Sequence, residues 1–427
     1  MPRRVAIVAG LRTPFVKAAT VFKDLTALDL GTAVVKELVQ RSEVPVDQID
    51  AMVFGAVIPN VAMPNISREI ALAAGLPKKV EAYSVSRACA TSMQSLTSAA
   101  DSIALGEYDV AIVGGVESMS DVPISLSKPL AQAFVDSSKG KTIVDKLKAF
   151  SSVHARDLVP VPPAIAEYST GLTMGESAEK MAKENGISRE AQDAWAHRSH
   201  SKAAAAWANG TFAKEVMHVL VPPKFETAIT EDNLVRKDST LEGYAKLKPV
   251  FDRKYGSITA GNASPLTDGA AALVIMSEEK AKALGLKPLG FLRSYAYAAV
   301  DPKWQLLQAP AFSAPKALKR AGMKLKDIDL VEIHEAFAAQ VLSNLQAWGS
   351  KKFADEHLGG AEPMGEVPDE KMNPNGGSIS LGHPFGATGA RLVNQTLREL
   401  NASGKGTALI SICAAGALGA ACVLERE

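Results

Sequence analysis

The sequence has few cysteines and almost no net charge. Its only cysteines, Cys89, Cys413 and Cys422, are too few and too scattered over 427 residues for a disulfide framework. This usage is typical of a reducing compartment, so we expect a cytoplasmic protein. The 47 basic residues nearly balance the 46 acidic ones. The protein therefore has no strong overall electrostatic field that would attract nucleic acid or an anionic membrane. An anionic ligand must be held by local groups.

Long hydrophobic runs are also scarce. The apolar run 5–10 is too short for the core of a signal peptide, and we expect it to be the first buried strand. Residues 407–424 are uncharged and about as long as the shortest membrane span. They are rich in alanine and interrupted at Gly416 and Gly419, which predicts two buried strands joined by a turn and no membrane span.

Strands and helices alternate near both ends of the chain. Strand-like runs such as 51–54 and 110–113 are separated by helical periodicity, which predicts an α/β fold with a mostly parallel sheet. A helix, a polar link ending in Ile-Asp and a strand follow one another at 34–54 and again at 314–333. This repeat predicts two duplicated α/β halves, whose helix starts at Cys89 and Gly386 could face one cleft.

The duplication suggests three parts. We expect the N-terminal half in residues 1–120 plus 252–287 and the C-terminal half in 288–427. Residues 121–251 interrupt the alternation and predict an inserted loop domain. Its cationic side chains are expected to form a solvated face: Lys139, Lys141, Lys146, Lys148 and Arg156. His197 and His200, three residues apart on a predicted helix, are interpreted as surface residues.

A thiol lies where a helix is expected to begin. In the stretch 84–93, Cys89 follows a short extended run, and Leu96, Ala100 and Ile103 then recur on one helical face. The unpaired N–H groups and the dipole at a helix start favour thiolate over thiol, which predicts a reactive nucleophile. A buried structural cysteine is the alternative that Cys89 alone leaves open.

Three later positions carry further reactive groups. His334 follows the strand 330–333, at the carboxyl end where open α/β sheets bind ligands. His383 lies in a glycine-rich turn before a helix, and Cys413 ends another strand. Each has a structural alternative, namely a hydrogen-bonded histidine, a phosphate-binding turn or a core cysteine. The turn lacks the Gly-Lys-Ser/Thr ending of a P-loop, and the Cys and His residues lack the short spacing of zinc sites, so no metal is expected.

Together these stretches resemble the thiolase family. The resemblance rests on Cys89, His-Glu-Ala-Phe at 334–337, Gly-His-Pro-Phe-Gly at 382–386 and Cys413, and it covers essentially the whole chain. Within the family, the chain is most similar to the 3-ketoacyl-CoA thiolase (β) subunits of fatty-acid-oxidation complexes. This implies a thiolase-like fold of layered helices and sheets, with CoA as a substrate and no resident cofactor. It also implies a homodimer that can join a hydratase/dehydrogenase α subunit.

The resemblance implies a role for each reactive group. His383 would take the proton of Cys89, and the thiolate would attack the 3-keto carbon of a 3-ketoacyl-CoA in β-oxidation. Cys413 would protonate the acetyl-CoA carbanion and then deprotonate the incoming CoA. His383 and a water held by His334 would stabilise one oxyanion, and backbone N–H groups near Cys89 and Ala415 the other. The positions that match ligand-contacting residues of the family are Met174, Arg236, Ser264, Phe337 and Ala415.

The chain departs from the family pattern in three places. The usual Ser-Gly after the nucleophile is Thr91-Ser92, the usual Asn is His334, and the usual Cys-x-Gly-Gly-Gly is Cys-Ala-Ala-Gly-Ala at 413–417. Because of these departures, the resemblance does not predict the geometry of the oxyanion-binding groups or the preferred length of the acyl chain. A biosynthetic acetoacetyl-CoA thiolase is the main alternative function. A β-ketoacyl-carrier-protein synthase would lack the second catalytic cysteine, and a non-catalytic lipid-binding relative would lack at least one of the four groups.

Overall fold

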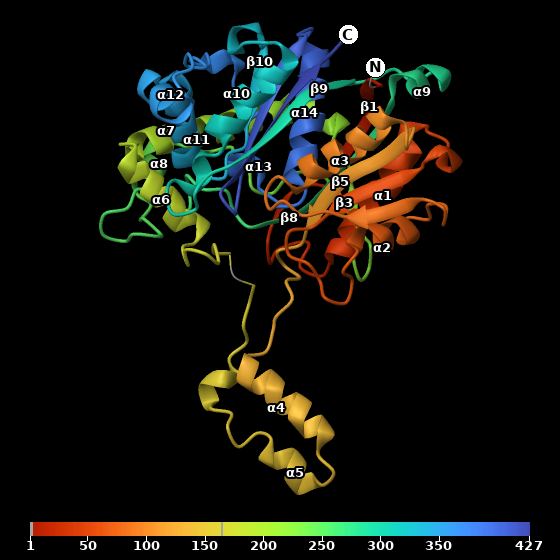
Figure 1. Cartoon of the computed structure of the whole chain (residues 1–427), viewed down its shortest axis with the longest axis vertical. Helices are drawn as coiled ribbons and strands as arrows, with labels where there is room; N and C mark the ends of the chain where they lie inside the picture. The colour runs from red at the N-terminus through yellow and green to blue at the C-terminus, as the bar shows by residue number, and fades with distance from the viewer. Residues whose placement is uncertain (1–2, 164) are drawn as a thin grey trace. The chain divides into compact units, whose positions relative to one another are not determined.

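The computed structural model describes residues 3–163 and 165–427, which fall into two compact units (Figure 1). The larger unit comprises Met1–Val57, Pro64–Asp121 and Ala166–Glu427, and the smaller one comprises Ile58–Met63 and Val122–Ile165. The larger unit carries the main sheet and every candidate site residue. Its fold is mixed α/β, as the alternation of strands and helices predicted.

The larger unit contains one sheet of ten strands and a separate two-stranded sheet, β6 with β7. The strands are β1 (Val5–Arg12), β2 (Val16–Lys17), β3 (Ala51–Gly55), β4 (Glu81–Ser84), β5 (Val110–Glu117), β6 (Val219–Val221), β7 (Thr227–Ile229), β8 (Thr267–Ser277), β9 (Gly290–Ala299), β10 (Leu330–Ile333), β11 (Thr407–Ala414) and β12 (Leu418–Glu425). In the large sheet their order is β10-β11-β12-β9-β1-β8-β5-β3-β4, and β2 pairs with β8.

This sheet repeats itself. The series β3-β5-β8-β1 has the same order and the same strand directions as β10-β11-β12-β9, since the first pair is parallel and the next two are antiparallel in each. The two series join where β1 pairs antiparallel with β9, at Ala6 with Phe291 and Ile7 with Gly290. The structure therefore contains the duplication that the repeated link predicted.

Fourteen α-helices occur in the described part of the chain. They are α1 (Ala27–Ser42), α2 (Ile66–Ala73), α3 (Thr91–Leu105), α4 (Lys128–Lys139), α5 (Ile143–Lys148), α6 (Met174–Glu184), α7 (Arg189–Ala208), α8 (Leu241–Ala245), α9 (Glu278–Ala283), α10 (Pro310–Ala321), α11 (Ala338–Gly349), α12 (Lys351–His357), α13 (Ser378–Leu381) and α14 (Thr388–Ser403). Several start with a capping side chain, such as Thr26 before α1 and Thr173 before α6.

The helices form layers because strand side chains alternate between the two faces of the sheet. In β5, Ala111 and Val113 belong to a core shared with α3 and α14, whereas Val110 and Ile112 belong to a core with α1 and α2. In β11, Ile410 joins the shared core, and the opposite face packs against α10 and α11. Helices α3 and α14, one from each half, therefore form the central layer.

The repeated Ile-Asp link has the same structural use in both halves. The carboxylate of Asp50, before β3, accepts hydrogen bonds from the amides of Asp109 and Val110 at 2.8 and 3.0 Å. The carboxylate of Asp329, before β10, accepts from Gly406 and Thr407, both at 3.0 Å. Each aspartate thus connects the start of one strand to the start of its parallel neighbour.

The C-terminal hairpin confirms one prediction from the sequence. Residues 407–424 form β11 and β12, which pair antiparallel from Thr407 with Glu425 to Ala414 with Leu418. The turn between them places Gly416 and Ala417 at positive φ, 79° and 57°. Across residues 3–163 and 165–427, no helix is long and apolar enough to cross a membrane.

The smaller unit is mainly helical. It holds α4 and α5, a backbone pairing of Ser125 with Val161, and an edge-to-face contact of Phe134 with Phe150 whose ring centroids lie 5.2 Å apart. The cationic side chains predicted to be solvated are exposed, which confirms that prediction: Lys139, Lys141, Lys146, Lys148 and Arg156.

Candidate active site

Cys89 lies in the tight connection between β4 and α3. Ala88 adopts a positive φ of 43°, an uncommon conformation for a residue with a side chain. The Thr91 hydroxyl holds this turn, since its Oγ1 accepts from the Arg87 amide at 2.8 Å and donates to the Ala88 carbonyl at 2.7 Å. Cys89 is partly exposed, two residues before the first residue of α3. The predicted position of the thiol at a helix start is confirmed.

The protonation state of this thiol differs from the prediction. Burial raises the pKa of Cys89 to about 11, and Glu117 acts in the same direction, while hydrogen bonds from the amides of Ala415 and Cys89 itself oppose the shift. Desolvation therefore outweighs the amide donors, and the expected preference for thiolate is wrong. In the resting protein Cys89 is a neutral thiol that needs a base.

His383 is a neutral imidazole with a defined tautomer. Burial, reinforced by the charge of Arg391, lowers the pKa of His383 to about 3. Its Nδ1 lies 2.6 Å from Thr388 Oγ1, and that hydroxyl donates to the Pro384 carbonyl at 3.0 Å. The hydroxyl proton is thus committed to Pro384, which leaves Oγ1 to accept a proton from Nδ1. The Nε2 atom then carries a lone pair, and it has no hydrogen-bond partner in the described structure.

His334 follows β10 and is fully buried. Its amide donates to the Ser411 carbonyl at 2.8 Å, which extends the β10–β11 pairing by one residue. Its Nδ1 lies 2.9 Å from Ser378 Oγ, and Nε2 lacks a partner among the described residues. Burial, followed by the charges of His383 and Arg391, lowers the pKa of His334 well below its ordinary value. This second imidazole is neutral as well.

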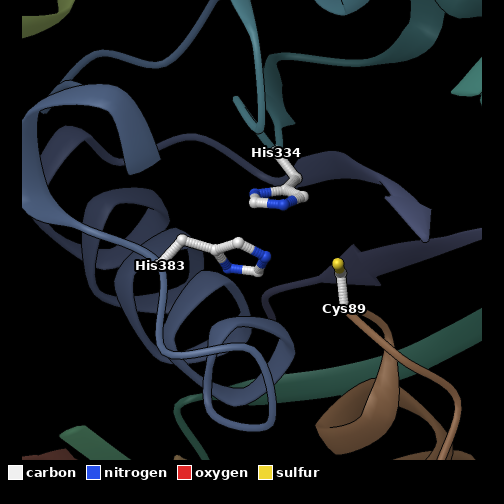
Figure 2. Close-up of side chains that lie close together, drawn as sticks. All are labelled: Cys89, His334 and His383. Carbon is white, nitrogen blue, oxygen red and sulfur yellow. The ribbon is translucent and has the colours of Figure 1, made fainter. Parts of the chain in front are cut away.

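The three side chains converge from different elements of the fold. Figure 2 shows Cys89, His334 and His383 directed toward one another. Their Sγ and ring nitrogen atoms lie within 4.8 Å of one another, and the two imidazole centroids are 4.1 Å apart. A thiol beside a neutral imidazole with a free nitrogen is suited to nucleophilic catalysis. A thiolate and two imidazoles are also a ligand set that zinc accepts.

Glycine makes this convergence possible. At Gly389, in the first turn of α14, a Cβ atom would lie 2.6 Å from the amide nitrogen of Met93 in α3. The Ala390 amide donates to Ser92 Oγ at 2.9 Å. Because the first turns of α3 and α14 touch, the residues just before them, which include Cys89 and His383, share one site.

Cys413 is a neighbour of Cys89. It is 1% exposed near the end of β11, in a cluster that includes Met174, Ala336 and Phe337. Burial and the neighbouring Cys89 raise the pKa of Cys413 well above its ordinary value, against hydrogen bonds from the amides of Cys413 and Ala336. The structure therefore brings the two thiols together, as the resemblance to the thiolase family implied, and both are protonated.

A cavity is lined in part by residues 263–265, in the segment that pairs with Phe337 and His383. Arg236 and Ser264 line this cavity of about 730 Å³, together with Lys17, Lys237, Val250 and Phe251 among others. The Ser264 amide donates to the Ala336 carbonyl at 2.8 Å, and the Phe251 and Phe337 rings are 6.3 Å apart. Phe251, which lines the cavity, therefore lies beside Phe337, which belongs to the cluster of Cys413.

Family models match nearly the whole chain. The model of the thiolase N-terminal domain matches residues 5–279, and that of the thiolase C-terminal domain matches residues 286–426. The chain belongs to the thiolase family. This thiolase is therefore an acyltransferase with the thiolase fold.

Individual relatives agree with this assignment. The thiolase is 56% identical over 424 residues to a protein of Salmonella choleraesuis (strain SC-B67) named 3-ketoacyl-CoA thiolase, covering 99% of this chain and 97% of the relative. It is 55% identical, over the same shares, to a protein of that name from Salmonella paratyphi B. The solved Bacillus anthracis acetyl-CoA acetyltransferase superposes with a TM-score of 0.85, at 34% identity and over 99% of each chain.

Several buried residues of this thiolase's site were missed or misread from the sequence. Thr388 contacts His383 five residues away, and Ser378 contacts both His334 and Arg391. The contact of Ser378 with His334 joins segments 44 residues apart and leaves no sequence signal. The interpretation of His200 as a surface residue is wrong, since it is 3% exposed and its Nδ1 accepts from the Arg236 amide at 3.0 Å. Burial lowers the pKa of His200 to about 4, ahead of a smaller effect from Arg236.

Proposed function

We propose that this thiolase is a 3-ketoacyl-CoA thiolase, which uses CoA to cleave a 3-ketoacyl-CoA into acetyl-CoA and a shortened acyl-CoA in fatty acid β-oxidation. The observation that carries the proposal is the convergence of a thiol, two neutral imidazoles and a second thiol at one site. Relatives with that name are 55–56% identical over nearly the whole chain.

In the first step, Nε2 of His383 takes the proton of Cys89, and Sγ attacks the 3-keto carbon. The raised pKa of Cys89 makes this base necessary, and the lowered pKa of His383 keeps the imidazole free to accept the proton. The alkoxide that forms is stabilised by backbone N–H groups near Cys89 and Ala415. Support for this placement comes from the Ala415 amide, which donates a hydrogen bond to Cys89.

Collapse of the alkoxide breaks the Cα–Cβ bond. The acyl group remains on Cys89, and the released acetyl-CoA carbanion takes the proton of Cys413. His383 and a water held by His334 stabilise the enolate oxygen of the thioester. The proton of the Cys413 thiol is available at neutral pH because burial raises its pKa.

The second half of the reaction runs through the same groups. The Cys413 thiolate takes the proton of an incoming CoA thiol, the CoA sulfur attacks the acyl group, and Cys89 leaves and regains its proton from His383. Both thiols and the imidazole return to their resting state, so the cycle balances without a further co-reactant.

We place CoA in the cavity lined by Arg236 and Ser264. The phosphates of CoA need local positive charge, because the net charge of the chain is only +1, and Arg236, Lys17 and Lys237 supply it. Met174 and Phe337 belong to the apolar cluster that contains Cys413, and we place the acyl end of the substrate against it.

Thiolysis of a medium- or long-chain 3-ketoacyl-CoA with CoA tests the function. We expect Cys89→Ala to lower kcat by on the order of 10⁴- to 10⁶-fold and Cys413→Ala by about 10²- to 10⁴-fold. Cys422→Ala is the matched control, since Cys422 is buried in β12, where it pairs with Ile410 and Tyr295, and its loss should leave kcat unchanged. Full activity in either of the first two variants would mean that the chemistry is assigned to the wrong thiol.

Chain length separates this function from the biosynthetic alternative. The Bacillus anthracis neighbour is titled an acetyl-CoA acetyltransferase, at the lower identity of 34%. We expect activity on substrates longer than four carbons. Activity confined to acetoacetyl-CoA would contradict the longer-chain assignment.

We also propose a cytoplasmic homodimer that can join a hydratase/dehydrogenase α subunit. The three free cysteines favour a reducing compartment. Strand β4 ends the sheet order and has an open edge that a second copy could extend. Native extracts that yield only the dimer would count against the α subunit.

We further propose that the chain divides into two halves, 1–120 plus 252–287 and 288–427, with an insert at 121–251. Limited proteolysis near residues 121 and 251 tests this division.

A further inference from the structure

Ser378 forms a buried junction behind His334. Its hydroxyl oxygen lies 2.9 Å from His334 Nδ1 and accepts a hydrogen bond from Arg391 Nη2 at 2.8 Å. All three side chains are 0% exposed. They come from the segment after β10, from α13 and from α14, so the junction exists only in the folded chain.

The number of protons decides the direction of the bond between Ser378 and His334. A serine hydroxyl has one proton and two acceptor positions. Arg391 cannot accept, so it occupies one acceptor position of Ser378 Oγ. The hydroxyl proton then has a single recorded acceptor among the described residues, His334 Nδ1. If Nδ1 donated instead, a fully buried hydroxyl proton would be left unpaired, at a substantial cost.

We propose that Ser378, oriented by Arg391, holds His334 with its proton on Nε2, so that His334 presents an N–H donor to the site. This inference rests on the proposed function. Thr388 holds His383 in the opposite tautomer, because its own proton goes to the Pro384 carbonyl. Two hydroxyls thus give two adjacent imidazoles complementary roles, one as acceptor and one as donor.

The chemistry requires this asymmetry. A thioester oxygen, an enolate oxygen and the lone pairs of water can only accept hydrogen bonds. The side chain that faces them must therefore donate one. His383 has no Nε2 proton until it has taken that of Cys89. His334 can therefore hold an oxygen from the beginning of the reaction, and Ser378 and Arg391 act as positioning residues.

Nitrogen-15 NMR of the full-length protein labelled at histidine tests the tautomers directly. Long-range proton–nitrogen spectra distinguish protonated from unprotonated ring nitrogens, and His334→Gln and His383→Gln assign the two signals among seven histidines. We expect the proton on Nε2 of His334 and on Nδ1 of His383. A proton on Nδ1 of His334 in the wild type would overturn the proposal, whether or not any variant folds.

A pair of serine variants adds a kinetic test. Ser378→Ala should lower kcat about 10- to 100-fold with little change in KM, the usual range for a residue that orients a reactive group. Ser380→Ala is the matched control, since Ser380 is equally buried in α13 but bonds to Ser199 and the Gly377 carbonyl. Ser378→Thr keeps the hydroxyl and should restore the His334 tautomer.

The outcomes separate the two proposals. Equal effects of Ser378→Ala and Ser380→Ala on both kcat and the His334 spectrum would overturn the positioning role. The spectra require no turnover, so they decide the tautomer even if the wild type cleaves no 3-ketoacyl-CoA, a result that would instead contradict the proposed function.

Discussion

The two halves of this thiolase use the same helix start for different chemistry. In the first half Cys89-Ala90-Thr91 leads into α3, and in the second Gly386-Ala387-Thr388 leads into α14, with an alanine at the N-cap in both. Each threonine bonds backward to a carbonyl, Thr91 to Ala88 and Thr388 to Pro384. Each hydroxyl oxygen also accepts one hydrogen bond. Thr91 accepts from the Arg87 amide, which orders the turn that carries Cys89, and Thr388 accepts from Nδ1 of His383, which orients the imidazole.

The reactive groups are unevenly distributed between the halves. The first half supplies Cys89, whereas the second supplies His334 after β10, His383 before α14 and Cys413 near the end of β11. Duplicating a fold therefore duplicates positions and not functions. The position two residues before the helix holds a thiol in the first half, at Cys89, and a glycine in the second, at Gly386.

Among the variants that compare the two halves, the largest expected effect comes from removing His383, the proposed base, which the second half provides. His383→Gln should lower kcat for thiolysis by about 10²- to 10⁴-fold, because a thiol whose pKa is about 11 ionises little by itself at neutral pH. Rapid-quench measurement of acyl transfer to Cys89 isolates the affected step. His218→Gln, at an exposed position, is the control. An unchanged rate of acylation would mean that another group takes the proton.

The two threonines offer a matched pair. Thr388→Val removes the acceptor of His383 Nδ1 and should lower kcat about 10- to 100-fold. Thr91→Val leaves the Arg87 amide unpaired and should lower the free energy of unfolding by about 1–3 kcal/mol, with a change in kcat below about tenfold. Steady-state kinetics and urea unfolding of both variants check the contrast. Equal losses of kcat in Thr388→Val and Thr91→Val would show that the two threonines do not differ in function.

The aspartates of the repeated link should behave alike. Asp50→Ala and Asp329→Ala each leave two strand amides without their acceptor, and each should lower the free energy of unfolding by about 1–2 kcal/mol. Urea titration measures both. Asp47→Ala is an exposed control whose effect should stay within about 0.5 kcal/mol. A much larger loss at one site would show that the halves depend unequally on this link.

The smallest expected effect is a flat pH profile. Because the pKa of His383 is lowered to about 3, its imidazole stays neutral as the pH falls from 8 to 5.5, and the base form is lost only near the lowered pKa. An ordinary histidine base with a pKa of about 6.5 would lose roughly tenfold in rate at pH 5.5. Measurements of kcat at saturating CoA distinguish the two. A midpoint near 6.5 would contradict the buried, neutral base.

Local patterns predicted the elements of the site better than its electrostatics. The thiol before α3, the histidine after β10 and the two strands at 407–424 follow from periodicity and turn residues, which act over short stretches of chain. The charge state of Cys89 cannot be predicted from such patterns, because it depends on burial and on Glu117, which lies in β5. His200 was misread, and Ser378 and Arg391 were missed, for the same reason, since segments far apart in sequence define their surroundings.

The pairing of β1 with β8 also constrains how the protein is made. Val5 pairs with Ser277, so the partner of the first strand is among the later parts of the chain to be translated. At about 5–20 residues per second, a nascent chain waits roughly 15–55 s between the two. During that time neither β8 nor β9 is available to β1, so its apolar side chains stay exposed to water until much of the chain has been made.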